Sequence, residues 1–243
     1  MKNNLNSIVF SIAIVIAAIV LGNAYLNRTK SEGTISVTGL GKADFTSDLI
    51  VWQGRFEKEN KDLKQAYLDL ENDKIIILEY LNSKGINSNS IVINSIKTRE
   101  KTKQKYSDQG KYIGNIFIGY ILSQSIQIES KEVEKAEKIS REITELLNKG
   151  VQFYSEPPRY YYTKLADLKI EMISKATADA RIRAEKISEN SDAEIGNLIS
   201  AKMGIFQITG QNSNENYSWG GTFNTSSKKK TASITMKLTY KVK

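Results

Sequence analysis

The chain has 243 residues, 40% hydrophobic and 26% charged, a balance that is typical of a folded body and excludes a collagen-like or globally disordered chain. It contains no Cys and no His, which excludes disulfides, thiolate or imidazole metal sites and acid–base catalysis by His. The net charge is +8, and only seven of the 35 basic residues are Arg. The lysines are interleaved with acidic residues along the chain, which indicates a compositional bias rather than a surface that binds nucleic acid. We expect no cofactor, because no phosphate-binding glycine loop or calcium-binding loop is present.

The N-terminal segment is uncharged between Lys2 and Arg28. The stretch from Leu5 to Leu26 has 22 residues. As a helix it would reach about 33 Å, enough for a bilayer core of about 30 Å. The sequence therefore predicts a membrane segment within residues 1–30, and its apolar positions include Ile8, Ile12, Ile16 and Leu21.

Two alternatives remain open for this segment. The apolar core from Ile8 to Leu21, in which Ser11 is the only polar side chain, is short enough for a signal peptide, and the small residues of Gly22-Asn23-Ala24 would allow cleavage. The longer uncharged stretch favours an uncleaved anchor. Either alternative places the remaining chain in the cell envelope, as a single-pass inner-membrane protein with its body outside the cytoplasm or as a periplasmic protein.

The rest of the chain, residues 31–243, is predicted to form one domain. Alternating apolar residues indicate strands, and apolar residues at helical spacing indicate helices. In chain order we expect strands over 34–38 and 48–57, a helix over 62–83, strands over 91–98 and 116–128, a helix over 130–146, a strand over 151–154, a helix over 163–187, and strands over 199–205 and 234–242.

This β-β-α-β-β-α-β-α-β-β order, preceded by the hydrophobic helix, indicates an α+β fold. The strands have one apolar face, which favours a mainly antiparallel sheet with helices packed on one side. Residues 101–112 are polar and suggest a hairpin loop. Residues 209–230, rich in Asn, Ser and Gly, suggest a long mobile connection that is dispensable for folding. The last strand, 234–242, is expected to be part of the core.

The first predicted strand opens with Ile35-Ser36-Val37-Thr38-Gly39-Leu40-Gly41, which has the pattern I-x-V-x-G-x-G. This pattern resembles the opening strand of the bacterial SIMPL-domain family, which includes periplasmic immunogenic proteins, although Ser47-Asp48 stands where Pro-Asp is usual in the family. Further similar segments, in matching order, are Gly119-Tyr120-Ile121-Leu122-Ser123, Gly150-Val151-Gln152-Phe153, the helix core from Ala176 to Glu185, and Ile195-Gly196-Asn197-Leu198.

The resemblance covers residues 33–243 and implies an α+β fold, export to the envelope and no established catalytic chemistry. It also implies a homo-oligomer, since some members are thought to form large ring-like assemblies, and others are linked to stress. We therefore expect a non-enzymatic envelope protein that acts through self-assembly and protein contact. The alternative is a periplasmic chaperone or a lipid-contacting protein of stress defence.

Two aromatic groups are candidate partner contacts. Tyr160 and Tyr161, beside Arg159, could form a stacking platform, or they could simply pack at a sheet edge. Tyr217, Trp219 and Phe223 lie in the long polar stretch, where large aromatics are unusual and suggest contact with a partner or a membrane.

Charged clusters are better explained by structure than by chemistry. The spacing expected for surface ion pairs on a helix is found among Asp179, Arg181, Arg183 and Glu185. The positions of Asp44 and Asp48 are those expected for residues that end strands and start turns. Lys228-Lys229-Lys230 could contact anionic lipid or protect an edge strand from aggregation.

Overall fold

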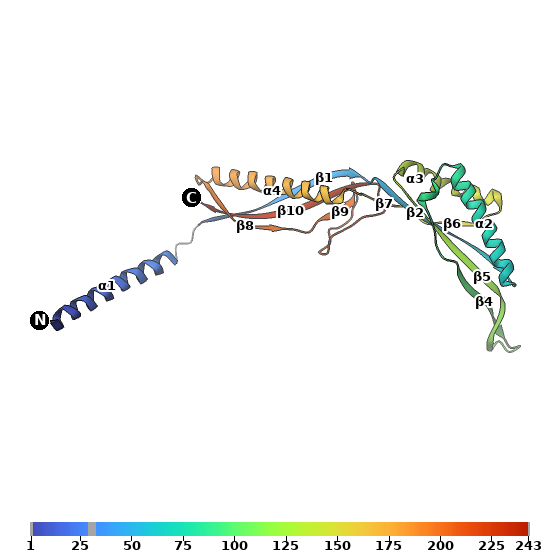
Figure 1. Cartoon of the computed structure of the whole chain (residues 1–243), viewed down its shortest axis with the longest axis horizontal. Coiled ribbons are helices and arrows are strands. Elements are labelled where there is room, and N and C mark those ends of the chain that lie inside the picture. Colours follow the sequence, from blue (N-terminus) through green and yellow to red (C-terminus); the bar gives the residue numbers. More distant parts are fainter. Residues whose placement is uncertain (1, 29–32, 243) are drawn as a thin grey trace. The chain divides into compact units, whose positions relative to one another are not determined.

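The structure is a computed structural model that describes residues 2–28 and 33–242, with side chains described for 9–25 and 33–242. The expected α+β class, the antiparallel strand pairing and the order of elements are confirmed (Figure 1). The chain divides into two compact units. One comprises residues 1–41, 173–204 and 234–243, and the other comprises residues 42–172 and 205–233.

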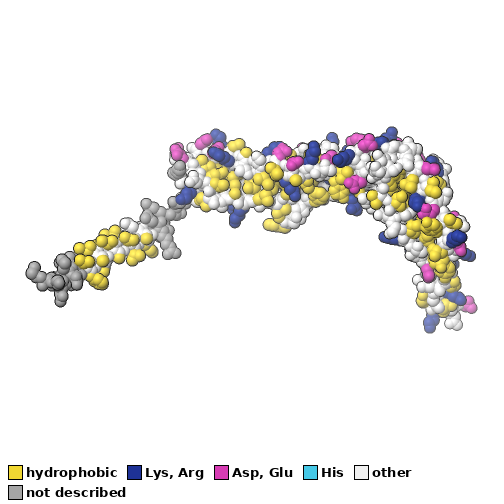
Figure 2. Space-filling model, in the orientation of Figure 1, with side chains coloured by type: hydrophobic (Ala, Val, Ile, Leu, Met, Phe, Trp, Pro, Cys, Tyr) yellow, Lys and Arg dark blue, Asp and Glu magenta, His cyan; other side chains and the backbone are white. Residues whose placement is uncertain are grey.

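The N-terminal helix α1 (Lys2–Arg28) forms over the uncharged segment. Its described apolar side chains are exposed, Ile12 by 54%, Ile16 by 56% and Leu21 by 69%, and they cover the described part of the helix in Figure 2. The side chain of Ile8 lies outside the described residues. Within the part of the chain that the structure describes, no helix combines the length and the apolarity needed to cross a membrane.

The unit that contains both chain ends is built around strand β10 (Lys229–Val242), which lies between β1 (Thr34–Thr46) and β8 (Ile195–Met203). Ile234 and Leu238 of β10 are buried, which confirms that the last strand belongs to the core. Helix α4 (Leu165–Glu189) turns a row of fully buried alanines inward, namely Ala176, Ala180 and Ala184.

The second unit contains a six-stranded sheet with the core order β3-β5-β2-β6. Strand β4 pairs with β5, and β7 pairs with β2. The strands are β2 (Leu49–Asn60), β3 (Ile91–Ile93), β4 (Lys97–Tyr106), β5 (Tyr112–Ser130), β6 (Phe153–Ser155) and β7 (Arg159–Tyr161). The helices of this unit are α2 (Leu63–Ser83), α3 (Val133–Glu142) and the short 3₁₀ segments η1 (Ser88–Ser90) and η2 (Ile143–Lys149).

One face of this sheet carries the main hydrophobic core. Ile50, Trp52 and Phe56 alternate along β2 and are fully buried, and they pack with apolar residues of β5, α2 and α3. Such side chains contribute about 1.5–3 kcal/mol each when buried. The indole N–H of Trp52 donates to the Ser155 hydroxyl at 2.9 Å, so its polar atom is also satisfied.

Three strands lie wholly or partly in segments where the sequence predicted no strand. The expected loop over residues 101–112 is wrong, because β4 continues to Tyr106 and β5 begins at Tyr112. The sequence did not predict this pair of strands, because β4 is exposed on both faces and therefore shows no alternation of apolar and polar residues. Likewise, β7 and the short β9 (Gln207–Gly210) are held by backbone pairing with β2 and β10 rather than by an apolar pattern.

Candidate functional site

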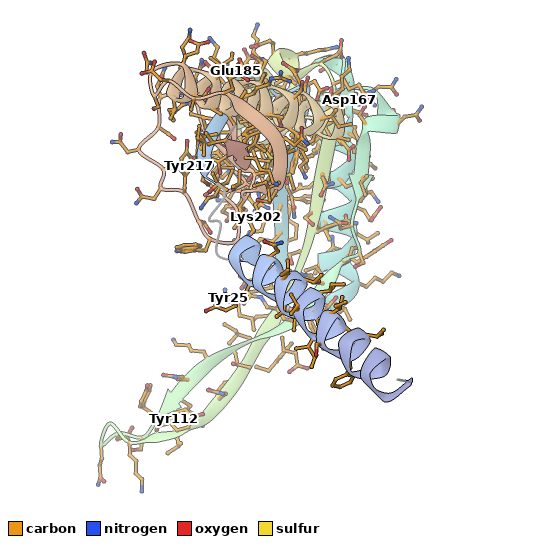
Figure 3. The ribbon with its side chains drawn as sticks, turned by 90° about the vertical axis from the view of Figure 1, so that its left-hand side faces the viewer. Tyr25, Tyr112, Asp167, Glu185, Lys202 and Tyr217 are labelled. Atoms are coloured by element: carbon orange, nitrogen blue, oxygen red, sulfur yellow. The ribbon has the colours of Figure 1, made fainter. Side chains whose placement is uncertain are left out.

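The residues between β9 and β10, 211–228, form a loop that we call the aromatic loop. Strand β9 pairs with residues 230–233 of β10, which fixes both ends of the loop. Trp219 is 96% exposed, Tyr217 is 65% exposed and Phe223 is 54% exposed. Figure 3 shows Tyr217 on this loop. Three large aromatic side chains are therefore presented to solvent by one segment.

The Gln207 side chain of β9 organises the tip of the loop. Its carbonyl oxygen accepts from the Thr222 N–H at 2.7 Å, and its amide donates to the Ser218 carbonyl at 2.8 Å. Backbone bonds add to this, because Ile208 donates to Thr222 at 2.7 Å and accepts from Asn224 at 2.9 Å. Trp219, which lies between Ser218 and Thr222, is thus carried by a fixed turn.

Glu215 and Asn224 form a second anchor inside the loop. The Glu215 carboxylate accepts from the Gly210 N–H at 2.8 Å and from the Asn224 amide, and the Asn224 carbonyl accepts from the Ser227 N–H at 2.8 Å. The Gly210 bond, followed by the Asn224 bond, lowers the pKa of Glu215. Asn224 itself is buried. These part-buried hydrogen bonds give the loop an internal structure that its composition did not indicate, and its mobility stays a prediction.

Tyr160 and Lys230 connect the loop to strand β7. The Tyr160 N–H donates to the Thr225 carbonyl at 2.7 Å, and the Lys230 ammonium donates to the Tyr160 carbonyl at 2.5 Å. Lys230 is only 2% exposed, and burial lowers its pKa to about 8 despite the opposing charge of Glu215. The aromatic loop thus lies over a buried lysine.

The predicted contact residues separate into two sets. Tyr217, Trp219 and Phe223 are exposed together on the aromatic loop. Tyr160 is buried, and Tyr161 is half-buried and pairs with Leu49 of β2. The expected platform therefore does not include the ring of Tyr160, whose backbone instead supports the aromatic loop.

The lysine run 228–230, at the start of β10, is also divided. Lys228 lies 2.8 Å from Glu134 and 2.7 Å from Glu137 of α3, Lys230 is buried, and Lys229 is exposed. The buried position of Lys230 was readable from the sequence, because it shares the parity of the apolar residues of β10. Gln207, Glu215 and Asn224 gave no such signal, because their partners are set by the path of the loop.

A polar cleft of about 330 Å³ lies beside the loop and is lined by both Asp44 and Glu215. The Asp44 carboxylate accepts from Thr231 at 2.5 Å and from Gln211 at 3.0 Å, and these bonds, the Thr231 bond most, lower its pKa. Both carboxylates are thus ionised hydrogen-bond acceptors that hold the loop ends. Among the described residues, no cluster of three or more acidic side chains could hold a metal ion.

The segments at 35–41 and 176–185 meet in the unit that contains the chain ends. A Cβ atom on Gly39 would lie 2.2 Å from the Ala176 carbonyl oxygen and 2.7 Å from the Ala180 side chain, so glycine and alanines allow β1 and α4 to touch. The Asp179 carboxylate accepts from the Leu40 N–H at 2.8 Å, a contact that lowers the pKa of Asp179. These residues have a structural role.

The other charged residues of this helix form the expected surface pairs. Arg183 lies 2.9 Å from Asp179, and Arg181 lies 2.8 Å from Glu185, each one helical turn away. Exposed pairs of this kind contribute a few tenths of a kcal/mol. Asp48 likewise has a structural role, since it accepts from the Thr163 N–H at 2.7 Å and hydroxyl at 2.6 Å.

Comparison with known proteins supports the resemblance seen in the sequence. No curated protein matches the chain. A family model described as SIMPL, protein of unknown function (DUF541), matches residues 35–242, from the first strand to the last. The chain therefore belongs to the SIMPL family.

Proposed function

We propose that this protein is a non-enzymatic component of the cell envelope that acts through self-assembly and protein contact, with the aromatic loop as its contact site. The observation that carries the proposal is Trp219, 96% exposed at the tip of a loop that Gln207 and Glu215 hold in place. Tyr217 and Phe223 extend the exposed aromatic surface on either side of it in the sequence.

Exposed aromatics on a fixed loop are suited to binding. Tyrosine and tryptophan are enriched among the residues that dominate interface energies, because they bury a large area with few rotatable bonds. A loop that is already ordered loses little conformational entropy when it binds, so more of the contact energy appears as affinity. The internal hydrogen bonds of the aromatic loop thus favour a contact role over a linker role.

The proposed partner is a second copy of this chain. The family resemblance implies oligomers, and an exposed Trp on each copy would be buried in every contact. The absence of Cys and His from the sequence removes the most common nucleophile and acid–base residues, which supports a binding rather than a catalytic role.

The envelope location rests on helix α1. Its described apolar side chains are exposed along the helix, as in a segment recognised by an export system or a lipid environment. The described residues of α1 between Val9 and Tyr25 carry no charge. We propose that this segment directs the body out of the cytoplasm.

The test is sedimentation velocity of the full chain in detergent, with wild type and Trp219→Ala side by side. If Trp219 is a dominant contact, its removal should weaken association by about 2 kcal/mol or more, roughly thirtyfold in Kd. The variant should then be dissociated at protein concentrations at which the wild type is still an oligomer.

Tyr67→Ala is the matched control, because Tyr67 is a 45% exposed aromatic on α2, outside the loop. It should sediment as the wild type does. Equal sedimentation of all three proteins would refute a role of the loop in assembly. A monomeric wild type that suppresses aggregation of unfolded proteins in a Trp219-dependent manner would indicate the chaperone alternative instead.

A further inference from the structure

Strand β4, its turn and the first residues of β5 form a two-stranded ribbon, residues 97–119, that we call the arm. Strand β2 pairs with β5 only from Tyr120 onward, so residues 112–119 of β5 pair with β4 alone (Figure 1). Figure 3 shows Tyr112 near the free end of this ribbon. A two-stranded ribbon exposed in this way is marginally stable by itself, which suggests that it serves a contact.

One face of the arm carries a line of cations. Because side chains alternate along a strand, Lys97, Arg99, Lys101, Lys103 and Lys105 of β4 point to the same face. The rise of about 3.3 Å per residue places neighbouring cations about 7 Å apart, over a length of about 27 Å. The alternation of basic residues in the sequence is the signal that could have predicted this stripe.

Most of these cations form no ion pair within the described part of the chain. Among the residues that the structure describes, Lys101 pairs with Glu59, whereas Lys97, Arg99, Lys103 and Lys105 have no ion-pair partner. The helices differ, since their cations are commonly paired one turn away, as in Arg141 with Glu137 or Arg183 with Asp179. The arm therefore concentrates uncompensated positive charge.

The strand register shows which residues of β5 lie beside the cations. Residues paired across the ribbon share a face, so Ile121 accompanies Arg99 and Ile116 accompanies Lys103. The other two positions paired to the stripe within the arm are Gly119 and Gly114. The cationic face thus combines a row of charges with the aliphatic side chains of Ile116 and Ile121. Figure 2 shows basic and hydrophobic side chains along the arm.

The aromatic residues lie on the opposite face. Phe117 pairs with Thr102 and Tyr112 pairs with Tyr106, and the ring centroids of Tyr106 and Tyr112 are 6.0 Å apart. This second face continues the core side of the sheet, since Thr98 pairs with the buried Leu122. The cations therefore occupy the side of the sheet opposite its core.

We infer that the cationic face of the arm binds the surface of a membrane rich in anionic lipid. Lysine ammoniums attract phosphate headgroups as point charges and need no fixed geometry, and Ile116 and Ile121 can contact the acyl boundary between them. The inference is independent of the assembly proposed above, because it uses a different surface and different residues.

The arrangement argues against one other role, and the experiment tests a second. A single-stranded nucleic acid would need aromatic stacking beside the cations, but the rings of Phe117 and Tyr112 lie on the other face. Edge lysines that only prevent aggregation would leave lipid binding unchanged when they are neutralised. The experiment separates all three roles.

The full chain is labelled at the turn of the arm through Gln109→Cys, which gives a unique site because the sequence has no Cys. The protein is bound to vesicles whose headgroups carry a fluorescence quencher, made from phosphatidylcholine alone or mixed with phosphatidylglycerol. We expect quenching of the label on the anionic vesicles, weaker quenching on the neutral ones, and loss of the difference at high salt. The label reports the arm even when α1 enters the vesicle.

The test variant is Lys97→Gln/Lys103→Gln/Lys105→Gln, in three exposed residues. Each cation near an anionic surface contributes about 1 kcal/mol, roughly fivefold, so the contact should weaken by up to about a hundredfold. Arginine at the same three positions should preserve the contact, which shows that the loss with glutamine is one of charge rather than of folding.

Lys131→Gln/Lys138→Gln/Lys149→Gln is the matched control, with the same change in net charge at exposed positions outside the arm. It should leave the quenching unchanged, and a label at Asn148→Cys should not be quenched. Equal quenching of the arm label on neutral and anionic vesicles, or equal effects of the two triple variants, would overturn the inference. So would a label that responds to soluble polyphosphate or DNA but not to vesicles.

Discussion

The ammonium group of Lys230 lies 2.5 Å from the carbonyl oxygen of Tyr160, and both residues are buried beneath the aromatic loop. A lysine in such a place is desolvated, and burial lowers its pKa from 10.5 to about 8. The lysine therefore couples the stability of this region to pH, in a range where an exposed lysine stays charged.

The first prediction concerns this coupling. In the unfolded chain Lys230 keeps its proton up to about pH 10.5, whereas in the folded protein it loses the proton near pH 8. Between these values the unfolded state binds more protons, so the contribution of Lys230 to stability rises with pH, by about 3 kcal/mol at most, and is constant below pH 8. Urea denaturation of the wild type and of Lys230→Met across this range measures it, and the variant should lack the rise.

Lys229→Met is the control, because Lys229 is the exposed neighbour in the sequence. It should retain the pH dependence of the wild type. If Lys230→Met and the wild type show the same change between pH 7 and pH 10, the buried lysine is not the group that titrates.

A second prediction tests the contact between β1 and α4. A Cβ atom on Gly39 would lie 2.2 Å from the Ala176 carbonyl oxygen, so Gly39→Ala must separate the strand from the helix. We expect a loss of about 1–3 kcal/mol, as for overpacked cores. Gly33→Ala is the control in the same unit, since its Cβ would meet Val242 at an ordinary 3.5 Å. Equal melting midpoints for the two variants would contradict the close contact.

Much of the fold was predictable from apolar patterns. Ile234 and Leu238 alternate with polar residues, and the strand that they predict is the central strand of its sheet. The small residues Gly39, Ala176 and Ala180 belong to the segments that resemble the SIMPL family, and the structure shows the close packing that they permit. Patterns fail where a segment is exposed on both faces, as in β4.

The candidate site was predictable in part. Trp219 was a candidate because large aromatics are rare in polar stretches; the structure shows it exposed, and its contact with a partner stays a prediction. The order of the loop was not predictable, because the path of the loop, and no pattern in its sequence, decides that Gln207 bonds the Thr222 N–H and that Glu215 bonds the Gly210 N–H. Composition describes how much apolar area a segment can bury, but not which hydrogen bonds its path allows.

A third prediction concerns export. Helix α1 is apolar at Ile14 and Ile16, whose side chains are 54% and 56% exposed. Two arginines in their place would make transfer into lipid or an export channel unfavourable by several kcal/mol. Ile14→Arg/Ile16→Arg should therefore remain in the cytoplasm, as measured by cell fractionation and protease accessibility. Ile14→Leu/Ile16→Leu should be exported as before, and unchanged fractionation of the arginine variant would rule out the proposed role of the segment.

The last prediction separates the two roles of the aromatic loop, its own order and its contact surface. Asn224 is buried, accepts from the Ser227 N–H and donates to Glu215, so Asn224→Ala leaves buried polar groups without partners. We expect a loss of about 1–3 kcal/mol in the free energy of unfolding. Trp219 is almost fully exposed, so Trp219→Ala should change stability by less than about 0.5 kcal/mol. Sedimentation should show the reverse order, with Trp219→Ala the more defective in assembly at temperatures where both variants are folded.

Replacing residues 211–228 by a short Gly-Ser turn should combine both defects, because it removes the anchors and the aromatics together. A replaced loop that melts with the wild-type midpoint would mean that Glu215 and Asn224 order the loop without stabilising the body beneath it.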